Sequence, residues 1–193
     1  MATAKIAKPE PVDLKLEVVV LGVSDVDRAK AYYVNLGWRL DADFSNGTDF
    51  RIIQVTPPRS PAAIIFGKGI VSPKPGSVTA LVLAVDDVDA ARDDLIARGA
   101  AVSEVFHFSG GPFSSGENRR VAGRDPEGQS YRSFASFEDP DGNGWLLQEI
   151  KTRLPGREWT STGARRIDDI KSVSDCPAMH TLRYALTAVA SRE

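Results

Sequence analysis

The chain has 193 residues, 42% hydrophobic and 26% charged, which is the composition of an ordinary globular protein that can bury a full core. Its net charge of −2 gives no electrostatic reason to expect a nucleic-acid partner, and no apolar run approaches the roughly 20 residues that a membrane-spanning helix needs. We therefore expect neither nucleic acid nor membrane as a partner. The single cysteine excludes an internal disulfide and indicates a reducing, cytoplasmic location.

Residues 1–14 lack the apolar core of a secretory signal and are predicted to be a flexible N-terminus. The first half then predicts one helix among four strands. Its elements are a strand Leu16–Val23, a helix Val26–Leu36, a strand Trp38–Phe44, a turn at Ser45-Asn46-Gly47, and strands Phe50–Thr56 and Ala62–Phe66. This half is expected to form a module over residues 15–67, followed by a proline-containing linker at 68–76.

The second half, residues 77–152, predicts the same order of elements. These are a strand Val78–Val85, a helix Val88–Arg98, a strand Ala101–Phe108, a long polar loop Ser109–Gln129, a strand Tyr131–Glu138, a turn Asp139–Gly144 and a strand Trp145–Ile150. Residues 153–193 are expected to be an extension with one amphipathic helix at about 176–191, whose apolar stripe is typical of a packing face. The class is therefore α+β, with two tandem βαβββ modules.

A stretch that occurs twice supports this division. Val20–Ala29 returns as Val82–Ala91 at an offset of 62 residues, and Gly37 closes the first copy as Gly99 closes the second. Each copy has a β-branched strand, an N-cap (Ser24 or Asp86), an acidic first turn and a glycine that ends the helix. Such a repeat indicates two copies of one supersecondary unit.

The doubled Val-x-Asp-Val-Asp-x-Ala pattern and the stretch Phe137–Asn143 (Phe-Glu-Asp-Pro-Asp-Gly-Asn) resemble the vicinal oxygen chelate superfamily. It includes glyoxalase I, bleomycin-resistance proteins and extradiol dioxygenases. The resemblance covers about residues 16–150, and residues 139–157 are similar to a bacterial branch called glyoxalase-like. It implies that the two modules form a cupped mixed sheet whose concave face holds the ligand. It also implies a homodimer, and the apolar stripe of the terminal helix agrees with this.

Enzymes of that superfamily place a divalent metal in the cup, with one ligand from the first and last strand of each module. Carried over onto this sequence, the four positions are Val18, Ile65, Ala80 and Leu146. None of these side chains has a donor for a metal. We therefore predict no metal and no cofactor, and a cup with an apolar floor. The nearby carboxylates Glu17 and Glu149 should point to the opposite side of their strands.

Five further residues are candidates for contacts with a ligand. Gln148 shares a face with Leu146 and is either a pocket residue, together with Tyr131 or Trp145, or a core glutamine bonded to a neighbouring strand. The loop Ser109–Gln129, with Phe113 near its tip, is either a ligand lid or a solvated surface loop. His107 is either an exposed strand-end residue or a single candidate base.

Three functions follow from these residues. The first is a metal-free protein that binds a small, largely apolar or aromatic molecule, which the four apolar positions favour. The second is a metal-dependent lyase, isomerase or dioxygenase of the glyoxalase type. The third is a cofactorless enzyme that uses His107, although one base without a nucleophile or second base is not a catalytic constellation.

Overall fold

The computed structural model describes residues 14–79, 81–109 and 119–153. The first unit consists of β1 (Val18–Val20), α1 (Val26–Asn35), β2 (Arg39–Asn46), β3 (Phe50–Thr56) and β4 (Ala63–Lys68). The second consists of β5 (Leu81–Val85), α2 (Val88–Ala97), β6 (Phe106–Phe108), β7 (Arg120–Ala122), β8 (Phe134–Glu138) and β9 (Gly144–Glu149). The predicted α+β class with tandem βαβββ modules is confirmed.

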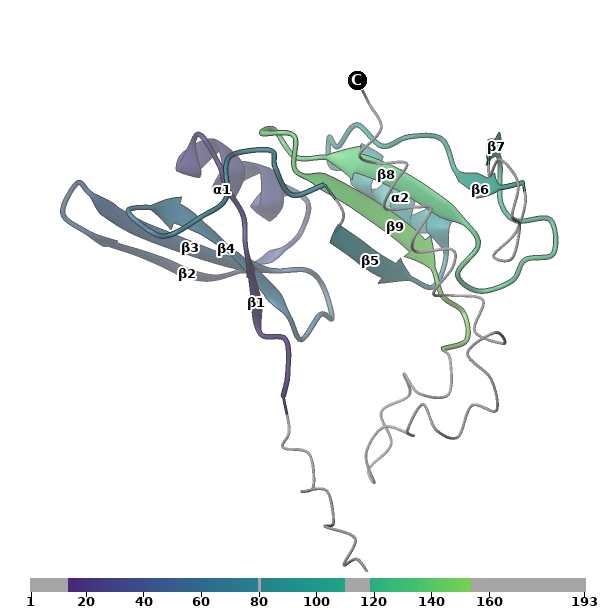
Figure 1. Cartoon of the computed structure of the whole chain (residues 1–193), viewed down its shortest axis with the longest axis horizontal. Coiled ribbons are helices and arrows are strands. Elements are labelled where there is room, and N and C mark those ends of the chain that lie inside the picture. The colour runs from purple at the N-terminus through teal and green to yellow at the C-terminus, as the bar shows by residue number, and fades with distance from the viewer. Residues whose placement is uncertain (1–13, 80, 110–118, 154–193) are drawn as a thin grey trace, which may run out of the picture.

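The strands form two sheets in which the four strands of each βαβββ module follow the same order, and sheet B has β7 as an additional edge strand (Figure 1). Sheet A has the order β1-β4-β3-β2, and sheet B has the order β5-β9-β8-β6-β7. In both, the first strand of the module lies parallel to its last strand, with Val19 opposite Ile64 in sheet A and Leu81 opposite Trp145 in sheet B. The two copies of the repeated stretch therefore hold equivalent places, in two sheets that are not hydrogen-bonded to each other within the described residues.

The helices begin at Val26 and Val88, as predicted, but the predicted N-caps Ser24 and Asp86 are wrong by one residue. The N-caps are Asp25 and Asp87, whose backbones are extended and whose carboxylates accept hydrogen bonds from Arg28 N and Ala90 N. A carboxylate at these positions reaches the orphan N–H groups of the first turn. The predicted helix-ending glycines are confirmed, because Gly37 and Gly99 have φ of 82° and 92°, where a glycine has little strain.

The predicted strand Ala101–Phe108 is wrong for most of its length. Only β6 is regular, and Val102 makes an isolated bridge to Phe137. At Ser103 the side-chain hydroxyl accepts the hydrogen bond from Ser136 N, at 2.9 Å, in place of a backbone carbonyl. This interrupts the regular pairing with β8. β7 lies in the stretch that was predicted to be a loop.

The strand predicted from Tyr131 begins only at Phe134. Tyr131 has a φ of 70°, in the left-handed region, which an extended strand cannot include.

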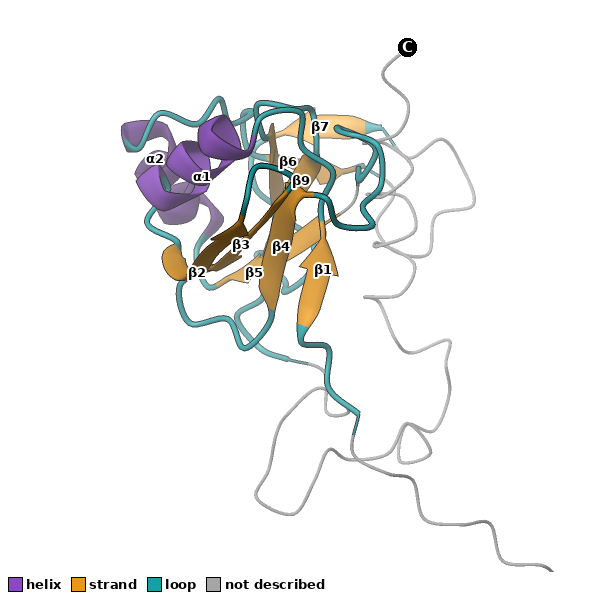
Figure 2. Cartoon of the chain, turned by 90° about the vertical axis from the view of Figure 1, so that its left-hand side faces the viewer, coloured by secondary structure: helices purple, strands orange, loops and turns teal. Residues whose placement is uncertain are grey.

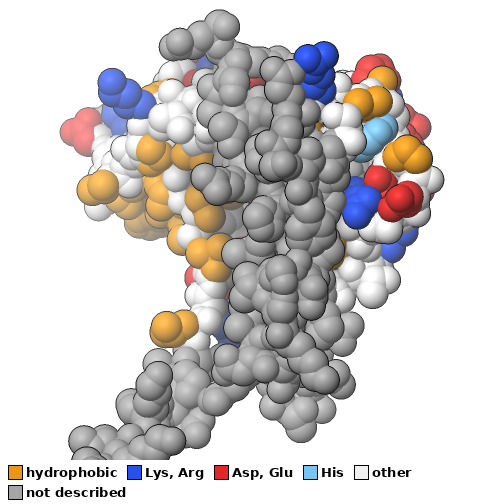
Figure 3. All heavy atoms as spheres, turned by 45° about the vertical axis from the view of Figure 1, so that its right-hand side comes forward, with side chains coloured by type: hydrophobic (Ala, Val, Ile, Leu, Met, Phe, Trp, Pro, Cys, Tyr) orange, Lys and Arg blue, Asp and Glu red, His pale blue; other side chains and the backbone are white. Residues whose placement is uncertain are grey.

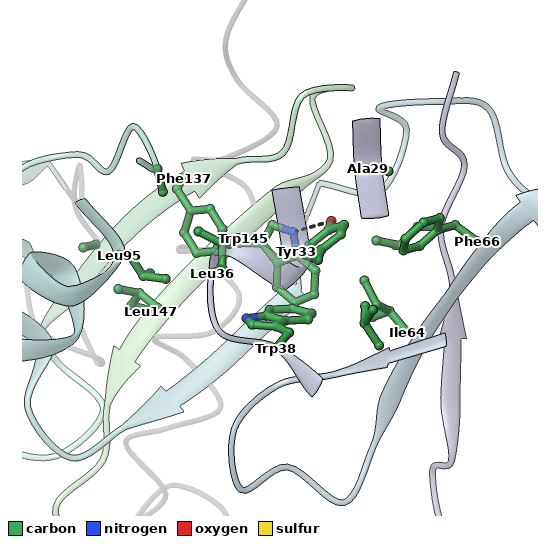
Figure 4. Close-up of a cluster of buried hydrophobic side chains, with 14 of the residues drawn as sticks. Ala29, Tyr33, Leu36, Trp38, Ile64, Phe66, Leu95, Phe137, Trp145 and Leu147 are labelled. Atoms are coloured by element: carbon green, nitrogen blue, oxygen red, sulfur yellow. Dashed lines mark hydrogen bonds between the residues drawn. The ribbon is translucent and has the colours of Figure 1, made fainter. Parts of the chain in front are cut away.

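One hydrophobic core joins the two modules. Both helices lie on the same side of the two sheets (Figure 2). Tyr33 of α1 packs edge-on against Trp145 of β9, with ring centroids 6.1 Å apart, and Trp38 meets the same indole at 5.1 Å (Figure 4). Module 1 thus contributes side chains to the core face of sheet B.

Several predictions lie outside the described residues. They include most of the flexible N-terminus and the terminal helix at about 176–191, together with Ala80 and Phe113 as site residues. No helix among the described residues is long and apolar enough to cross a membrane.

Candidate functional site

The sheet faces turned away from the helices carry the predicted site positions, and we call them the helix-free faces. In sheet A, Ile53 and Val55 are buried in the shared core, so alternation places Ile52, Gln54 and Thr56 on the helix-free face. The register puts Gln54 opposite Ile65, and Ile65 opposite Val20. The two candidate positions of module 1, Val18 and Ile65, therefore share this face.

The helix-free face of sheet A is apolar and only half-buried. Val18, Val20, Ile52 and Ile65 are partly accessible, and Phe44 at the edge strand has 58% of its surface exposed. Figure 3 shows hydrophobic side chains gathered on the left of the molecule, over this sheet. A monomeric protein seldom leaves such a sheet face uncovered unless the face binds something.

A β-bulge adds a carboxylate to this face. The pairing of β2 with β3 shifts between Leu40 and Ala42, and the extra residue Asp41 accepts a hydrogen bond from the hydroxyl of Thr56. Arg39 and Thr56 lower the pKa of Asp41 by hydrogen bonding to its carboxylate. The bulge therefore turns a charged side chain toward the helix-free face.

The helix-free face of sheet B is an aromatic cluster. Phe106 stacks on Phe134 with centroids 5.7 Å apart, Phe108 meets Phe134 edge-on at 5.6 Å, and Leu146 completes the cluster. All four side chains are at least nine-tenths buried. The guanidinium of Arg120 lies over the Phe106 ring, 4.1 Å from its centroid.

The two modules place a polar residue at matching positions. Gln54 lies opposite Ile65 in sheet A, and Ser136 lies opposite Leu146 in sheet B. The sequence reasoning missed both residues, as well as Asp41 and Arg120. Gln54 and Ser136 can be identified once the strand register is known, because they lie opposite Ile65 and Leu146. Nothing local in the sequence gives that register.

Of the two interpretations of Gln148, the geometry agrees with that of a buried core glutamine. Its side chain is 1% exposed, and its Nε2 donates a hydrogen bond to the carbonyl of Tyr131 at 3.1 Å. The N–H of Tyr131 in turn donates to the carbonyl of Glu149 at 2.7 Å. These two bonds hold Tyr131 in its left-handed conformation.

The residues present do not fit the divalent metal that the fold implies. The side chains of Val18, Ile65 and Leu146 have no donor atom, and a divalent ion among them would keep an uncompensated charge in an apolar site. Within the part of the chain that the structure describes, no group of three or more His, Cys, Asp or Glu side chains could hold a metal ion.

The two neighbouring carboxylates do not rescue a metal site. Glu149 is fully buried on the helix side, where its Oε1 accepts a hydrogen bond from Val88 N at the start of α2. The prediction that Glu149 points away from Leu146 is confirmed. Glu17 is exposed just before β1.

His107 lies on the opposite side of β6 from the aromatic cluster. Its neighbours Phe106 and Phe108 both belong to the cluster, so alternation turns the imidazole away. Its Nδ1 lies 2.9 Å from the carbonyl of Gly123, and because a carbonyl only accepts, Nδ1 carries the proton. The imidazole is thus directed away from Leu146 and Ser136.

A hollow of about 380 Å³ lies next to Arg120, the residue that covers the Phe106 ring. Its lining includes Ser103, Arg120, Ser136 and Glu138, with Val102 and Phe137 as apolar members. Ser136 and Glu138 belong to the helix-free face of sheet B, because Ala135 and Phe137, which alternate with them on β8, face the core. Arg120 belongs to the same face, because it lies opposite Phe108. The volume suits a small organic group.

The turn Asp139–Asn143 fastens the two modules together, a role that the sequence pattern did not indicate. Tyr33 donates from its hydroxyl to Asp139 Oδ2 at 2.8 Å, and Asn143 Nδ2 donates to the same oxygen at 2.8 Å. Asp141 Oδ1 accepts from the backbone N–H of Ser24 at 3.1 Å and pairs with Arg28 at 2.9 Å. Burial and the Asp139 carboxylate raise the pKa of Tyr33 far above its ordinary value.

Comparison with known proteins agrees with this architecture. The family model described as Glyoxalase/Bleomycin resistance protein/Dioxygenase superfamily matches residues 15–147. A glyoxalase/bleomycin resistance protein from Streptomyces sp. CB03234 is 31% identical, with a TM-score of 0.50, over 70% of this chain and 100% of that one. No curated protein matches the chain.

Two further solved structures are similar. TnmS3, described as an antibiotic binding protein from the same Streptomyces strain, is 30% identical with a TM-score of 0.53, over 73% of this chain and 99% of that one. A member of the glyoxalase/bleomycin resistance protein/dioxygenase superfamily from Sphaerobacter thermophilus DSM 20745 is 26% identical with a TM-score of 0.51, over 71% of this chain and 98% of that one.

Proposed function

Because the chain belongs to the Glyoxalase/Bleomycin resistance protein/Dioxygenase superfamily, we propose that it is a metal-free protein that binds a small, largely apolar or aromatic molecule. The observation that carries this proposal is the chemistry of the metal positions. Val18, Ile65 and Leu146 present hydrocarbon where a catalytic member needs donors. Hydrocarbon on a sheet face favours burial of apolar ligand surface.

The similarity to TnmS3 supports binding rather than catalysis. That protein is described as binding an antibiotic, and it shares 30% identity over 73% of this chain. The half-buried face of sheet A offers the accessible apolar surface, while Gln54 and Asp41 at its polar end supply groups that can orient a ligand. We propose a cytoplasmic location, because the single cysteine fits a reducing compartment.

We propose that the protein acts as a homodimer in which a second copy covers the helix-free face of sheet A. Within the described residues, no side chain of module 1 belongs to the aromatic cluster on sheet B. The candidate residues of one chain therefore lie on two separate sheets. A second copy would bring the exposed apolar face of one module against another sheet and enclose a ligand between them.

The geometry gives no comparable support to the catalytic alternatives. A metal-dependent lyase, isomerase or dioxygenase would need donors that Val18, Ile65 and Leu146 do not have. A cofactorless enzyme based on His107 would need that imidazole on the helix-free face, and alternation turns it to the other side of β6.

Metal analysis and ligand binding test the proposal together. Tag-free protein is expected to contain no stoichiometric Zn, Ni, Fe, Mn or Mg, and a chelator should leave its thermal unfolding unchanged. The neutral aromatic probe 2-naphthalenemethanol should bind with a stoichiometry of one per chain by calorimetry. I65D should weaken that binding, because a carboxylate on the apolar face must lose its hydration when the probe binds.

V121D is the matched control. Val121 is 38% exposed, and it pairs with His107 on the side of β6 and β7 away from the aromatic cluster. It should leave binding of the probe unchanged. About one metal ion per chain, with isomerisation of the methylglyoxal–glutathione adduct that disappears on chelation, would contradict the binding function.

A further inference from the structure

We propose that Asn46, at the tip of the β2–β3 hairpin, is a site of spontaneous deamidation and isoaspartate formation, and that the fold protects a second Asn-Gly pair, Asn143-Gly144. The inference concerns a chemical modification and does not depend on the proposed binding function. Asn-Gly occurs at these two places in the chain, so the local sequence gives both the same intrinsic reactivity. Their surroundings in the structure make them different.

The reaction needs an asparagine, the glycine that follows it, and water. The backbone nitrogen of the glycine gives its proton to hydroxide and forms a bond to Cγ of the asparagine, while the Cγ–Nδ2 bond breaks and ammonia leaves with a proton from water. Water then opens the resulting cyclic imide, at Cγ to give aspartate or at the backbone carbonyl carbon to give isoaspartate. Glycine has no Cβ to obstruct the approach, which favours ring closure in this thermolabile pair.

Asn46 and Gly47 lie in an exposed turn. The hairpin of β2 and β3 projects at the left of Figure 1, and both residues are exposed at its end. Within the described residues, no hydrogen bond holds the carboxamide of Asn46 or the N–H of Gly47. Gly47 has a φ of 64°, and a Cβ placed on it would meet no atom within 4 Å. The two reacting groups are therefore open to water and have room to approach each other.

Asn143 and Gly144 have the opposite surroundings. Asn143 is fully buried, and its Nδ2 donates to the carbonyl of Gly22 at 3.0 Å and to Asp139 Oδ2 at 2.8 Å. The N–H of Gly144 donates to the carbonyl of Val78 at 2.7 Å. The carboxamide cannot turn toward the glycine nitrogen without breaking two buried hydrogen bonds, and that nitrogen is shielded from hydroxide.

The modification would change the helix-free face of sheet A. Asn46 lies on this face, because it is two residues from Phe44 on β2. Deamidation therefore adds a negative charge beside an apolar surface. Isoaspartate also adds a methylene to the main chain where Asn46 pairs with Phe50, and a longer backbone shifts this pairing. The change loosens the end of the hairpin at which the rings of Phe44 and Phe50 meet, with centroids 6.2 Å apart.

Peptide mapping of the aged, full-length protein tests the inference. Trypsin releases Asn46 within residues 40–51 and Asn143 within residues 133–151, so mass spectrometry follows each site separately after incubation at pH 8. In the folded protein Asn46 should convert more than about tenfold faster than Asn143, which reacts only in the fraction of molecules whose turn has opened. The peptide 40–51 should yield two new chromatographic peaks, one aspartyl and one isoaspartyl.

Urea and one variant provide the controls. In urea the two sites should convert at rates within about twofold of each other, because unfolding removes the hydrogen bonds that protect Asn143. N46Q is the matched variant, since glutamine keeps the carboxamide but has to close a larger and less favourable ring. Its peptide 40–51 should keep its mass over the same incubation, and thermal unfolding confirms that the variant is folded.

Three results would overturn the inference. Equal rates at the two sites in the folded protein would show that burial does not protect Asn143. Conversion of Asn46 in urea but not in the folded protein would show that the hairpin protects this site as well. A mass gain in residues 40–51 of N46Q equal to that of the wild type would place the reaction at another residue.

Discussion

Single side chains in the turn after β8 hold the two modules in one relative position. Tyr33 and Asp139 are 106 residues apart in the chain, yet they share a buried hydrogen bond of 2.8 Å. The indole of Trp145 donates to the same tyrosine hydroxyl at 3.3 Å. A phenol that joins a buried carboxylate and a buried indole contributes more than a hydrogen bond at the surface, because each partner would otherwise be left desolvated.

Y33F should lower the free energy of unfolding by about 2 kcal/mol at pH 7, because it removes a buried hydrogen bond to a charged group. Urea unfolding followed by tryptophan fluorescence measures this loss. The adjacent Y32F is the matched control, since the hydroxyl of Tyr32 donates to the carbonyl of Glu138 at the surface at 3.1 Å. A loss from Y33F no greater than that from Y32F would contradict the buried role.

The same variant has a pH signature. Burial and Asp139 raise the pKa of Tyr33 above the ordinary value of 10, so above pH 10 the unfolded chain releases a proton that the folded chain keeps. The stability that the wild type gains from Tyr33 should therefore be complete below pH 10 and decline as the pH rises beyond it. The difference in unfolding free energy between wild type and Y33F should therefore stay constant up to about pH 9 and shrink as the pH rises past 10.

At the scale of elements, an ion-pair cluster ties the start of α2 to the end of β9. Arg124 pairs with Asp87 and Asp89 at the first turn of α2, and it reaches the fully buried Glu149 at 3.2 Å. Lys151 lies 3.2 Å from the other oxygen of Glu149, which has no hydrogen bond. A buried carboxylate with such incomplete pairing depends on each of its partners.

R124Q should lower the free energy of unfolding by about 2 kcal/mol, because Glu149 then keeps its buried charge with Lys151 as its remaining cation. The double variant R124Q/E149Q should be less destabilised than R124Q, since it also removes that charge. Thermal and urea unfolding of the two variants measure the difference.

R98Q serves as the comparison, because Arg98 forms an exposed pair with Asp94 one helical turn away. It should cost under about 0.5 kcal/mol. If the loss of unfolding free energy in the double variant equals the sum of the losses in R124Q and E149Q, the two residues are not coupled.

At the scale of the whole molecule, the half-buried apolar face of sheet A predicts the proposed homodimer. The chain has a mass of 20.9 kDa, so light scattering at micromolar concentration should report twice that mass. F44D should shift the equilibrium toward the monomer, because Phe44 is 58% exposed on the helix-free face and is not part of the shared core. A wild-type protein that stays at the mass of one chain would refute the dimer.

V121D again provides the control, as an exposed valine on the far side of β6 and β7. It should leave the mass unchanged. Equal dissociation by F44D and V121D would mean that the dimer does not use the face of sheet A.

The sequence by itself determined the local features of this protein. The repeated stretch predicted two equivalent βαβββ modules, and β1 and β5 do hold equivalent places. The glycines that end the helices and the apolar residues at Val18, Ile65 and Leu146 could be identified because a backbone preference or a missing donor atom is a property of the residue itself. These features require no knowledge of partners distant in the chain.

Only the tertiary structure decided what depends on partners far apart in sequence. The register places Gln54 opposite Ile65, the turn after β8 captures Tyr33, and β7 brings Arg120 over Phe106. Ser103 shortened a strand that the pattern predicted, because its hydroxyl took a place in the ladder of β8. Each of these contacts has a free energy set by packing and desolvation between distant segments, and no local propensity encodes that term.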